Sequence, residues 1–171
     1  RTQVPSVLEK MTNAEALKAN LSRLEVCSQK GLVERFDSSI GASTVLMPYG
    51  GKYQLTEEEA SVQKVPVLGK ESNTASIMTF GYNPFISEWS PFHGAAYAVV
   101  ESISKVVAVG GKWQGIRFSF QEYFERLGNN TETWGKPFSA LLGTLFVQKG
   151  FGLPAIGGKD SMSGTFNNIH V

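Results

Sequence analysis

The strongest constraint on the fold is one amphipathic helix predicted in the middle of the chain. Ser90 and Pro91 form a typical helix start, with a hydroxyl side chain at the cap and proline in the first turn. The spacing predicts a helix that runs to about Ala108 and is closed by Gly110. A helix with one apolar face must bury that face against another layer of structure. The apolar residues of the predicted face are Ala96, Val99, Val100, Ile103, Val106 and Val107.

Shorter signals around this helix alternate between strand and helix. Apolar spacing predicts a helix near 13–29, capped by Asn13 and stopped by Gly31. Ser119 and Glu122 have the spacing of a capping box and predict a short helix that ends at Gly128. The remaining predicted elements are a helix around 138–146 closed by Gly150, a rigid loop at 80–84, two short strands between 32 and 47, and strands at 65–68, 74–80, 116–118 and 153–156.

This alternation, without an internal repeat, predicts an α+β (α/β-like) fold with a mixed β-sheet flanked by helices on one face. The length of 171 residues is typical of a single domain, which we expect to span residues 1–171. The chain begins at Arg1 without a methionine and ends at Ile169-His170-Val171, which resembles the start of a strand. We therefore expect it to be an excised piece of a longer protein.

Composition excludes several classes of protein. The 16 Lys and Arg residues nearly balance the 15 Asp and Glu residues, so the chain lacks the basic excess of a nucleic-acid binder. The sequence contains no run of about 18 apolar residues, so it predicts no membrane span. A single cysteine, Cys27, forms no disulfide framework and favours a reducing, cytoplasmic location. With two histidines and one cysteine, the residues for a typical zinc site are lacking.

The segment that follows the predicted strand 153–156 carries the strongest chemical signal. Two glycines let the backbone turn sharply and present its N–H groups to an anion. A lysine adds a point charge suited to phosphate, and serine hydroxyls add donors. The residues concerned are Gly157, Gly158, Lys159, Asp160, Ser161 and Ser163. The spacing is not that of a Walker A loop, and a tight structural turn with a solvated lysine is the alternative interpretation.

Two further positions could carry chemistry. Glu101 and Lys105 lie four residues apart on the predicted central helix, on a face otherwise made of small residues. That face either packs against a partner or ligand, or carries an ordinary surface ion pair. Asp37, followed by two serines and a glycine, could belong to a metal or phosphate loop or to an Asx turn.

Three stretches resemble one family. Ile156–Ser163 is similar to the glycine-lysine-aspartate-serine segment of the phosphoribosylformylglycinamidine synthases of purine biosynthesis. The stretch from Arg35-Phe36-Asp37 to Thr44-Val45, and the helix segment from Val99 through Glu101 and Lys105 to Gly110, agree with that family in order. The resemblance covers about residues 10–168. It implies an aminoimidazole-ribonucleotide-synthetase-like N-terminal domain from the second half of such an enzyme.

The resemblance implies a ligase that uses ATP and glutamine-derived ammonia to convert formylglycinamide ribonucleotide to formylglycinamidine ribonucleotide. ATP or ADP with Mg²⁺ is the implied cofactor. Glu101 matches a metal-binding glutamate, whereas Lys105 and Met78 replace the family's asparagine and aspartate and so weaken the case for the metal. The implied nucleotide or phosphate contacts are Asp37, Lys105, Gly157, Gly158, Lys159, Asp160, Ser161 and Ser163. No catalytic residue is predicted, and the fragment alone should be inactive.

The implied partners are other domains of the same polypeptide, with a homodimer through the sheet as a further option; no nucleic acid and no membrane is expected. Two alternatives stay open. One is a purely structural or oligomerisation module without a retained nucleotide site. The other is a different ATP-using member of the superfamily, such as a thiamine-monophosphate kinase-like or selenophosphate synthetase-like enzyme.

Overall fold

The computed structural model describes residues 10–35, 39 and 42–170. It divides into two compact units, Arg1–Met78 and Thr79–Val171. Each unit is built from helices and two-stranded sheets, which is the α+β class expected from the sequence. The three strand pairs of the described part do not join into the single larger sheet that the alternation predicted.

The first unit contains two short helices, α1 (Asn13–Leu21) and α2 (Lys30–Val33). Thr12, and not Asn13, caps α1: its hydroxyl accepts from the Glu15 backbone while the Glu15 carboxylate accepts from the Thr12 backbone. The predicted helix 13–29 therefore ends early, at Leu21. Gly31 does not stop a helix but lies inside α2.

One antiparallel pair, β1 (Ser61–Lys64) with β2 (Ala75–Met78), forms the sheet of the first unit. An isolated bridge from Thr44 to Gln63 extends it. β2 confirms the predicted strand at 74–80, whereas the strand predicted at 65–68 was wrong and falls in the connection between β1 and β2. Among the described positions of 32–47 there is no strand, only the end of α2 and the bridge at Thr44.

The second unit begins with α3 (Pro84–Trp89) and α4 (Pro91–Ala108). Asn83 caps α3 with its side-chain oxygen, so the predicted rigid loop continues into a helix that the sequence analysis missed. α4 confirms the central helix: Ser90 caps it and Gly110 follows with a left-handed φ of 88°. Val99, Ile103 and Val106 of its predicted apolar face are buried.

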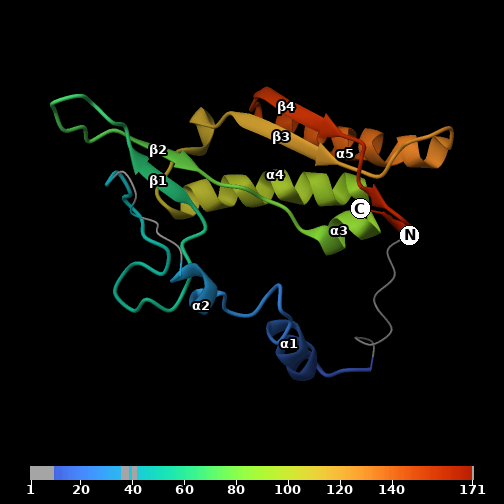
Figure 1. The fold of residues 1–171 in the computed structure, drawn as a ribbon, viewed down its shortest axis with the longest axis horizontal. Coiled ribbons are helices and arrows are strands. Elements are labelled where there is room, and N and C mark those ends of the chain that lie inside the picture. Colours follow the sequence, from blue (N-terminus) through green and yellow to red (C-terminus); the bar gives the residue numbers. More distant parts are fainter. Residues whose placement is uncertain (1–9, 36–38, 40–41, 171) are drawn as a thin grey trace. The chain divides into compact units, whose positions relative to one another are not determined.

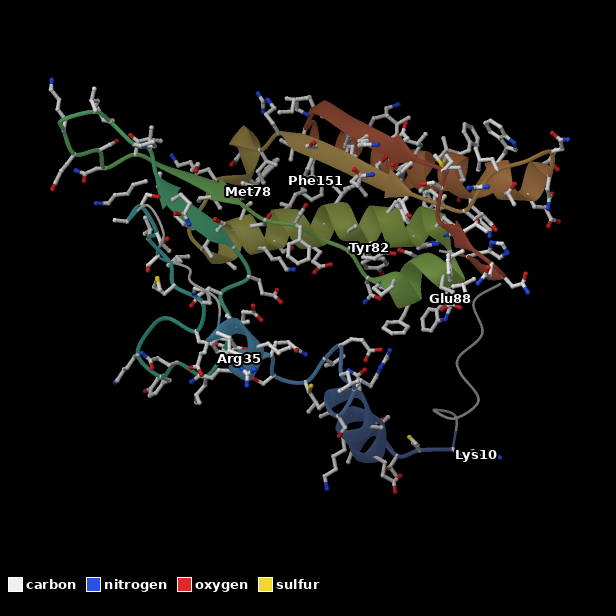
Figure 2. All side chains as sticks on the ribbon, viewed as in Figure 1. Lys10, Arg35, Met78, Tyr82, Glu88 and Phe151 are labelled. Carbon is white, nitrogen blue, oxygen red and sulfur yellow. The ribbon has the colours of Figure 1, made fainter. Side chains whose placement is uncertain are left out.

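The long helix α5 (Thr131–Phe151) starts at the cap Asn130 and ends at Gly152, which has a φ of 67°. It is longer than the predicted helix 138–146 and passes through Gly150. α5 packs against α4, and Gly143 allows a close approach of the two helices: a Cβ there would overlap the Phe92 carbonyl oxygen. Phe151, labelled in Figure 2, is the last residue of α5. Its ring packs against that of Trp113 in the 3-10 turn η1 (Trp113–Gly115), with ring centroids 5.6 Å apart.

The parallel strands β3 (Phe118–Tyr123) and β4 (Ala155–Ser161) run along these helices (Figure 1). Phe118 points into a core cluster with Val99 and Ile103 of α4, Val147 of α5, and Leu153. The helix predicted at 119–128 was wrong because the alternation of Phe118 and Phe120 with polar residues buries one face of a strand. A short hairpin, β5 (Thr165–Phe166) with β6 (Ile169–His170), ends the unit.

The predicted glycine loop at 157–164 is largely a strand. Gly157 and Gly158 lie inside β4, in register with Ser119 and Phe120 of β3. A Cβ on Gly158 would come within 2.5 Å of the Phe120 carbonyl oxygen, whereas one on Gly157 would meet nothing within 4 Å. Gly158 therefore serves close strand pairing, and the sharp turn expected from the sequence does not form.

Candidate functional site

The predicted pair on α4 forms a tight ion pair. Lys105 Nζ lies 2.7 Å from Glu101 Oε1, and the Lys105 side chain is only 12% exposed. The ammonium also lies over the Phe80 ring, 4.6 Å from its centroid. A surface pair of this spacing contributes little, but partial burial and the aromatic face hold this lysine in one place.

The small residues around this pair are explained by a neighbouring segment of the same unit. Thr79 donates its hydroxyl to the Ser102 carbonyl at 2.8 Å. Gly81 lies so close to α4 that a Cβ on it would overlap the Ala98 carbonyl oxygen. The helix face that was expected to receive a partner or ligand is thus partly covered by residues 79–81, which leave Glu101 and Lys105 half-buried.

Among the predicted phosphate residues of β4, Lys159 and Asp160 are exposed and Ser161 is half-buried. Lys159 is exposed and donates from Nζ to Ser161 Oγ at 3.0 Å. Because side chains alternate along a strand, Lys159 and Ser161 share one face and Asp160 belongs to the other. Ser163 is exposed in the connection to β5. Strand β4 therefore offers an ammonium and a hydroxyl side by side, which is a suitable pair for a phosphate oxygen.

A buried carboxylate on β3 was missed by the sequence analysis, which interpreted Glu122 as a capping residue. Glu122 is only 9% exposed, and its Oε2 atom is buried without a hydrogen-bond partner. It stands in register with Asp160 of β4. Burial, followed by the charge of Asp160, raises the pKa of Glu122 to about 7. The alternation Phe118-Ser119-Phe120-Gln121-Glu122 is the sequence signal that places this residue on the buried face.

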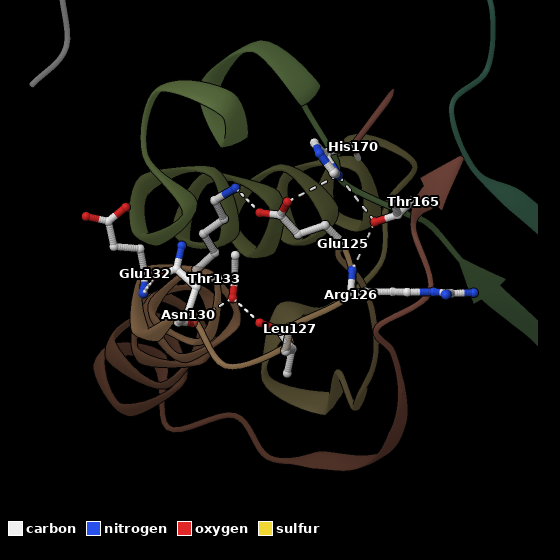
Figure 3. A network of polar contacts seen from close by, with 9 residues as sticks. Glu125, Arg126, Leu127, Asn130, Glu132, Thr133, Thr165 and His170 are labelled. Atoms are coloured by element: carbon white, nitrogen blue, oxygen red, sulfur yellow. Dashed lines mark hydrogen bonds and ion pairs between the residues drawn. The ribbon is translucent and has the colours of Figure 1, made fainter. Parts of the chain in front are cut away.

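A second acidic residue, Glu125, is buried in a polar network (Figure 3). It pairs with Lys136 of α5, and His170 of β6 lies 3.4 Å from its other oxygen. The hydrogen bond from Lys136 holds the pKa of Glu125 below its usual range. Thr165 joins the network by accepting from the Arg126 backbone at 3.1 Å. This network ties the terminal hairpin to the start of α5.

Two further positions bear on the predicted site. Asp37 lies outside the described residues. Met78, at the position of the family's aspartate, is an exposed residue of β2 in the first unit. Glu101 and Lys105 are together on α4, and Lys159 and Ser161 are together on β4, so the predicted residues fall into two groups on different elements.

A shallow hollow of about 690 Å³ lies at the end of α5, lined by Val100, Phe146, Val147, Lys149, Gly150 and Phe151. It is apolar and contains none of the predicted site residues, so we do not assign it chemistry. No helix in the described part of the chain has the length and apolar character needed to cross a membrane.

Comparison with known proteins gives a consistent picture. The chain is 31% identical over 110 residues to phosphoribosylformylglycinamidine synthase subunit PurL of Nitrobacter winogradskyi, which covers 64% of this chain and 13% of that protein. It is 26% identical over 156 residues to PurL of Thermoplasma volcanium, covering 88% of this chain and 19% of the relative. The chain thus spans less than a fifth of the length of these relatives. No protein-family model matches it.

The fold agrees with the sequence. The structure of PurLQS from Thermotoga maritima matches with a TM-score of 0.67 and 14% identity, over 85% of this chain and 22% of that chain. At this identity the match concerns the fold alone. The chain is therefore similar in sequence to one segment of phosphoribosylformylglycinamidine synthase subunit PurL and similar in fold to one part of PurLQS.

Proposed function

We propose that the chain is a domain of an ATP-dependent ligase that converts formylglycinamide ribonucleotide to formylglycinamidine ribonucleotide with glutamine-derived ammonia. The observation that carries this proposal is the similarity to PurL, which extends over 88% of the chain in the longest alignment. Because the chain spans a small part of such proteins, it would contribute phosphate binding and scaffold and would not catalyse the reaction alone. Its partners would be other domains or subunits, as in PurLQS.

The phosphate of a nucleotide such as ATP or ADP would bind at the exposed face of β4. Lys159 would supply the charge and Ser161 a hydroxyl, with Ser163 in the following connection and Gly157 keeping that face free of a side chain. Gly158 belongs to the other face and lets β4 approach β3 closely. Asp160 belongs to the opposite strand face and would reach a phosphate only through a bound cation. Asp37 stays a proposed contact from the first unit.

The Mg²⁺ proposed at Glu101 must compete with an ammonium. Lys105 Nζ already lies 2.7 Å from Glu101 Oε1, so the residues present do not fit a divalent cation unless Lys105 moves. We therefore propose that Lys105 itself supplies the positive charge toward the nucleotide, with Glu101 holding it in place. Nucleotide binding that uses Lys105 in place of a cation should then depend only weakly on Mg²⁺.

Isothermal titration of the full chain with ADP, with and without Mg²⁺, tests the proposal. We expect Lys159→Ala to weaken binding by roughly tenfold or more, since a charged hydrogen bond contributes about 1.5–3 kcal/mol. Lys149→Ala, which changes an exposed lysine at the end of α5, is the matched control. Lys105→Asn should make binding depend on Mg²⁺. A cooperatively folded chain that gives no heat with ADP would contradict nucleotide binding.

A second candidate function is that of a scaffold or oligomerisation module, cytoplasmic like the first. It is favoured by the apolar side chains that α5 exposes: Phe138, Leu141, Leu142, Leu145 and Phe146 are 41–68% exposed. Light scattering of the full chain over a concentration series checks for the homodimer, and a monomer at every concentration would count against it.

A further inference from the structure

The face of β3 that lies against the helices carries an unexpected charge. Phe118, Phe120 and Glu122 alternate on this face, and Phe118 belongs to the hydrophobic core. Glu122 is only 9% exposed, and its Oε2 atom has no hydrogen-bond partner in the described structure. A buried acceptor left unsatisfied destabilises the fold, and an unpaired buried charge does so more strongly. Such a group calls for an explanation.

The neighbouring strand supplies a second carboxylate beside it. Asp160 is in register with Glu122 on the parallel strand β4. In-register side chains of adjacent strands project from the same face, and neighbouring strands lie about 4.7–4.9 Å apart. The two negative charges repel each other, and this repulsion adds to burial in raising the pKa of Glu122. The repulsion ends only if one group takes up a proton or a cation lies between them.

Three basic side chains of this unit have partners of their own. Lys159 belongs to the other face of β4 and donates to Ser161. Lys136 pairs with Glu125, and Arg117 donates to the Ile116 carbonyl at 2.8 Å. Asp160 is exposed, so the pair is open to solvent on the side of β4. A small ion could enter there and keep part of its water shell.

We propose that Glu122 and Asp160 bind a divalent cation of the hard, oxygen-preferring class, such as Mg²⁺ or Mn²⁺, at the junction of β3 and β4. Carboxylate oxygens are the ligands that such ions prefer, and Mg²⁺ characteristically binds through one or two carboxylates with water completing its shell. The described residues bring no third His, Cys, Asp or Glu to this pair, so water would fill the remaining positions of the ion's shell. Glu122 Oε2 is the inner ligand, and Asp160 lies on the solvent side.

This site is separate from the one proposed at Glu101, which lies on α4 and is paired with Lys105. It requires neither nucleotide nor ligase activity. A variant that removes Glu101 therefore distinguishes the two sites in one experiment.

The probe is Mn²⁺ alone, titrated into the full chain without nucleotide at about pH 8, above the pKa of Glu122, and followed by the electron paramagnetic resonance signal of the free ion. The Glu122→Gln and Asp160→Asn variants should each weaken Mn²⁺ binding by roughly tenfold or more, the loss of one charged ligand. Glu101→Gln should leave this binding in place. Glu88→Gln, which alters an exposed glutamate of α3, is the matched control.

Folding of each variant is checked by circular dichroism and thermal unfolding. Glu122→Leu is a second variant that keeps the fold by removing the buried charge altogether, and it should also lose the ion. The proposal is overturned if the parent chain binds no Mn²⁺, or if Glu122→Leu binds it as the parent does. It is also overturned if only Glu101→Gln reduces the binding.

Discussion

Glu122 of β3 and Asp160 of β4 stand in register on parallel strands, one carboxylate buried and the other exposed. The buried one has an oxygen without a hydrogen-bond partner in the described structure. We therefore expect the stability of the second unit to depend on pH and, through the proposed cation site, on divalent cations.

Stability without divalent cations should fall as the pH rises from about 4.5 to about 7. The pKa of Glu122 is raised from 4.5 to about 7 in the folded chain, so the folded state binds a proton that the unfolded state has lost. The stabilisation is complete below the unfolded pKa and is lost as the pH passes the folded one. Thermal unfolding in EDTA across this pH range measures the slope.

Glu122→Leu should remove this contribution and raise the free energy of unfolding at about pH 8 by about 1–3 kcal/mol. At about pH 5, where Glu122 is protonated, the gain should be smaller. Glu88→Gln should keep the parental pH slope, because Glu88 is exposed on α3. A leucine variant with an unchanged slope would show that another group causes it.

Gly158→Ala should destabilise the β3–β4 pair. A Cβ at this position would lie 2.5 Å from the Phe120 carbonyl oxygen, and backbone cannot move aside as a flexible side chain can. Overpacking of this kind costs about 1–3 kcal/mol. Chemical denaturation measures the change. Gly157→Ala is the matched control in the same strand, since nothing lies within 4 Å of its Cβ, and equal losses in both variants would contradict the close-approach argument.

Gly143→Ala should destabilise the contact between α4 and α5, because its Cβ would overlap the Phe92 carbonyl oxygen. The same change at Gly135 of α5 meets nothing within 4 Å and should stabilise the helix by about 0.5–1 kcal/mol. The two variants thus have opposite predicted signs in one helix. Urea denaturation of both variants measures the change in the free energy of unfolding. A stabilised Gly143→Ala chain would mean that the helices can move apart at this point without losing stability.

Glu125→Gln should loosen the terminal hairpin β5–β6. The lost partners are Lys136 and His170, which hold the hairpin to the start of α5 (Figure 3). The pKa of Glu125 is lowered in the folded chain, so its stabilisation is present above the ordinary carboxylate pKa and is lost as the pH falls through the lowered one. Amide hydrogen exchange at Thr165–His170 should be faster in the variant. Glu132→Gln, at the start of the same helix, should leave the hairpin unchanged.

Local signals in the sequence predicted the elements with well-marked ends. Ser90 and Pro91 correctly predicted the start of α4, and Gly110 its end, because caps and left-handed glycines act within one turn of a helix. The same local reasoning failed at Ser119 and Glu122, where a capping-box spacing occurs by chance within a strand. In this segment, burying Phe118 and Phe120 against the helices contributes more free energy than a local helix cap would.

The candidate site likewise has one part that the sequence predicted and one part that it could not predict. Glu101 and Lys105 were predicted to share a helix face, and the 2.7 Å ion pair between them confirms it, because their spacing alone brings them together. The contact of Lys105 with Phe80, and the covering of the neighbouring face by Gly81, come from a segment about twenty residues earlier in the chain. No periodicity predicts such a contact.

The sequence by itself determined the main helices, the α+β class and the resemblance to one family of ligases, since periodicity, caps and short motifs are local properties. Only the tertiary structure decided that Gly157 and Gly158 pair within a strand and that Glu122 lies buried beside Asp160. Strand register and burial arise from contacts between segments about forty residues apart. Their free energy depends on the whole packed unit and cannot be assigned to either segment alone.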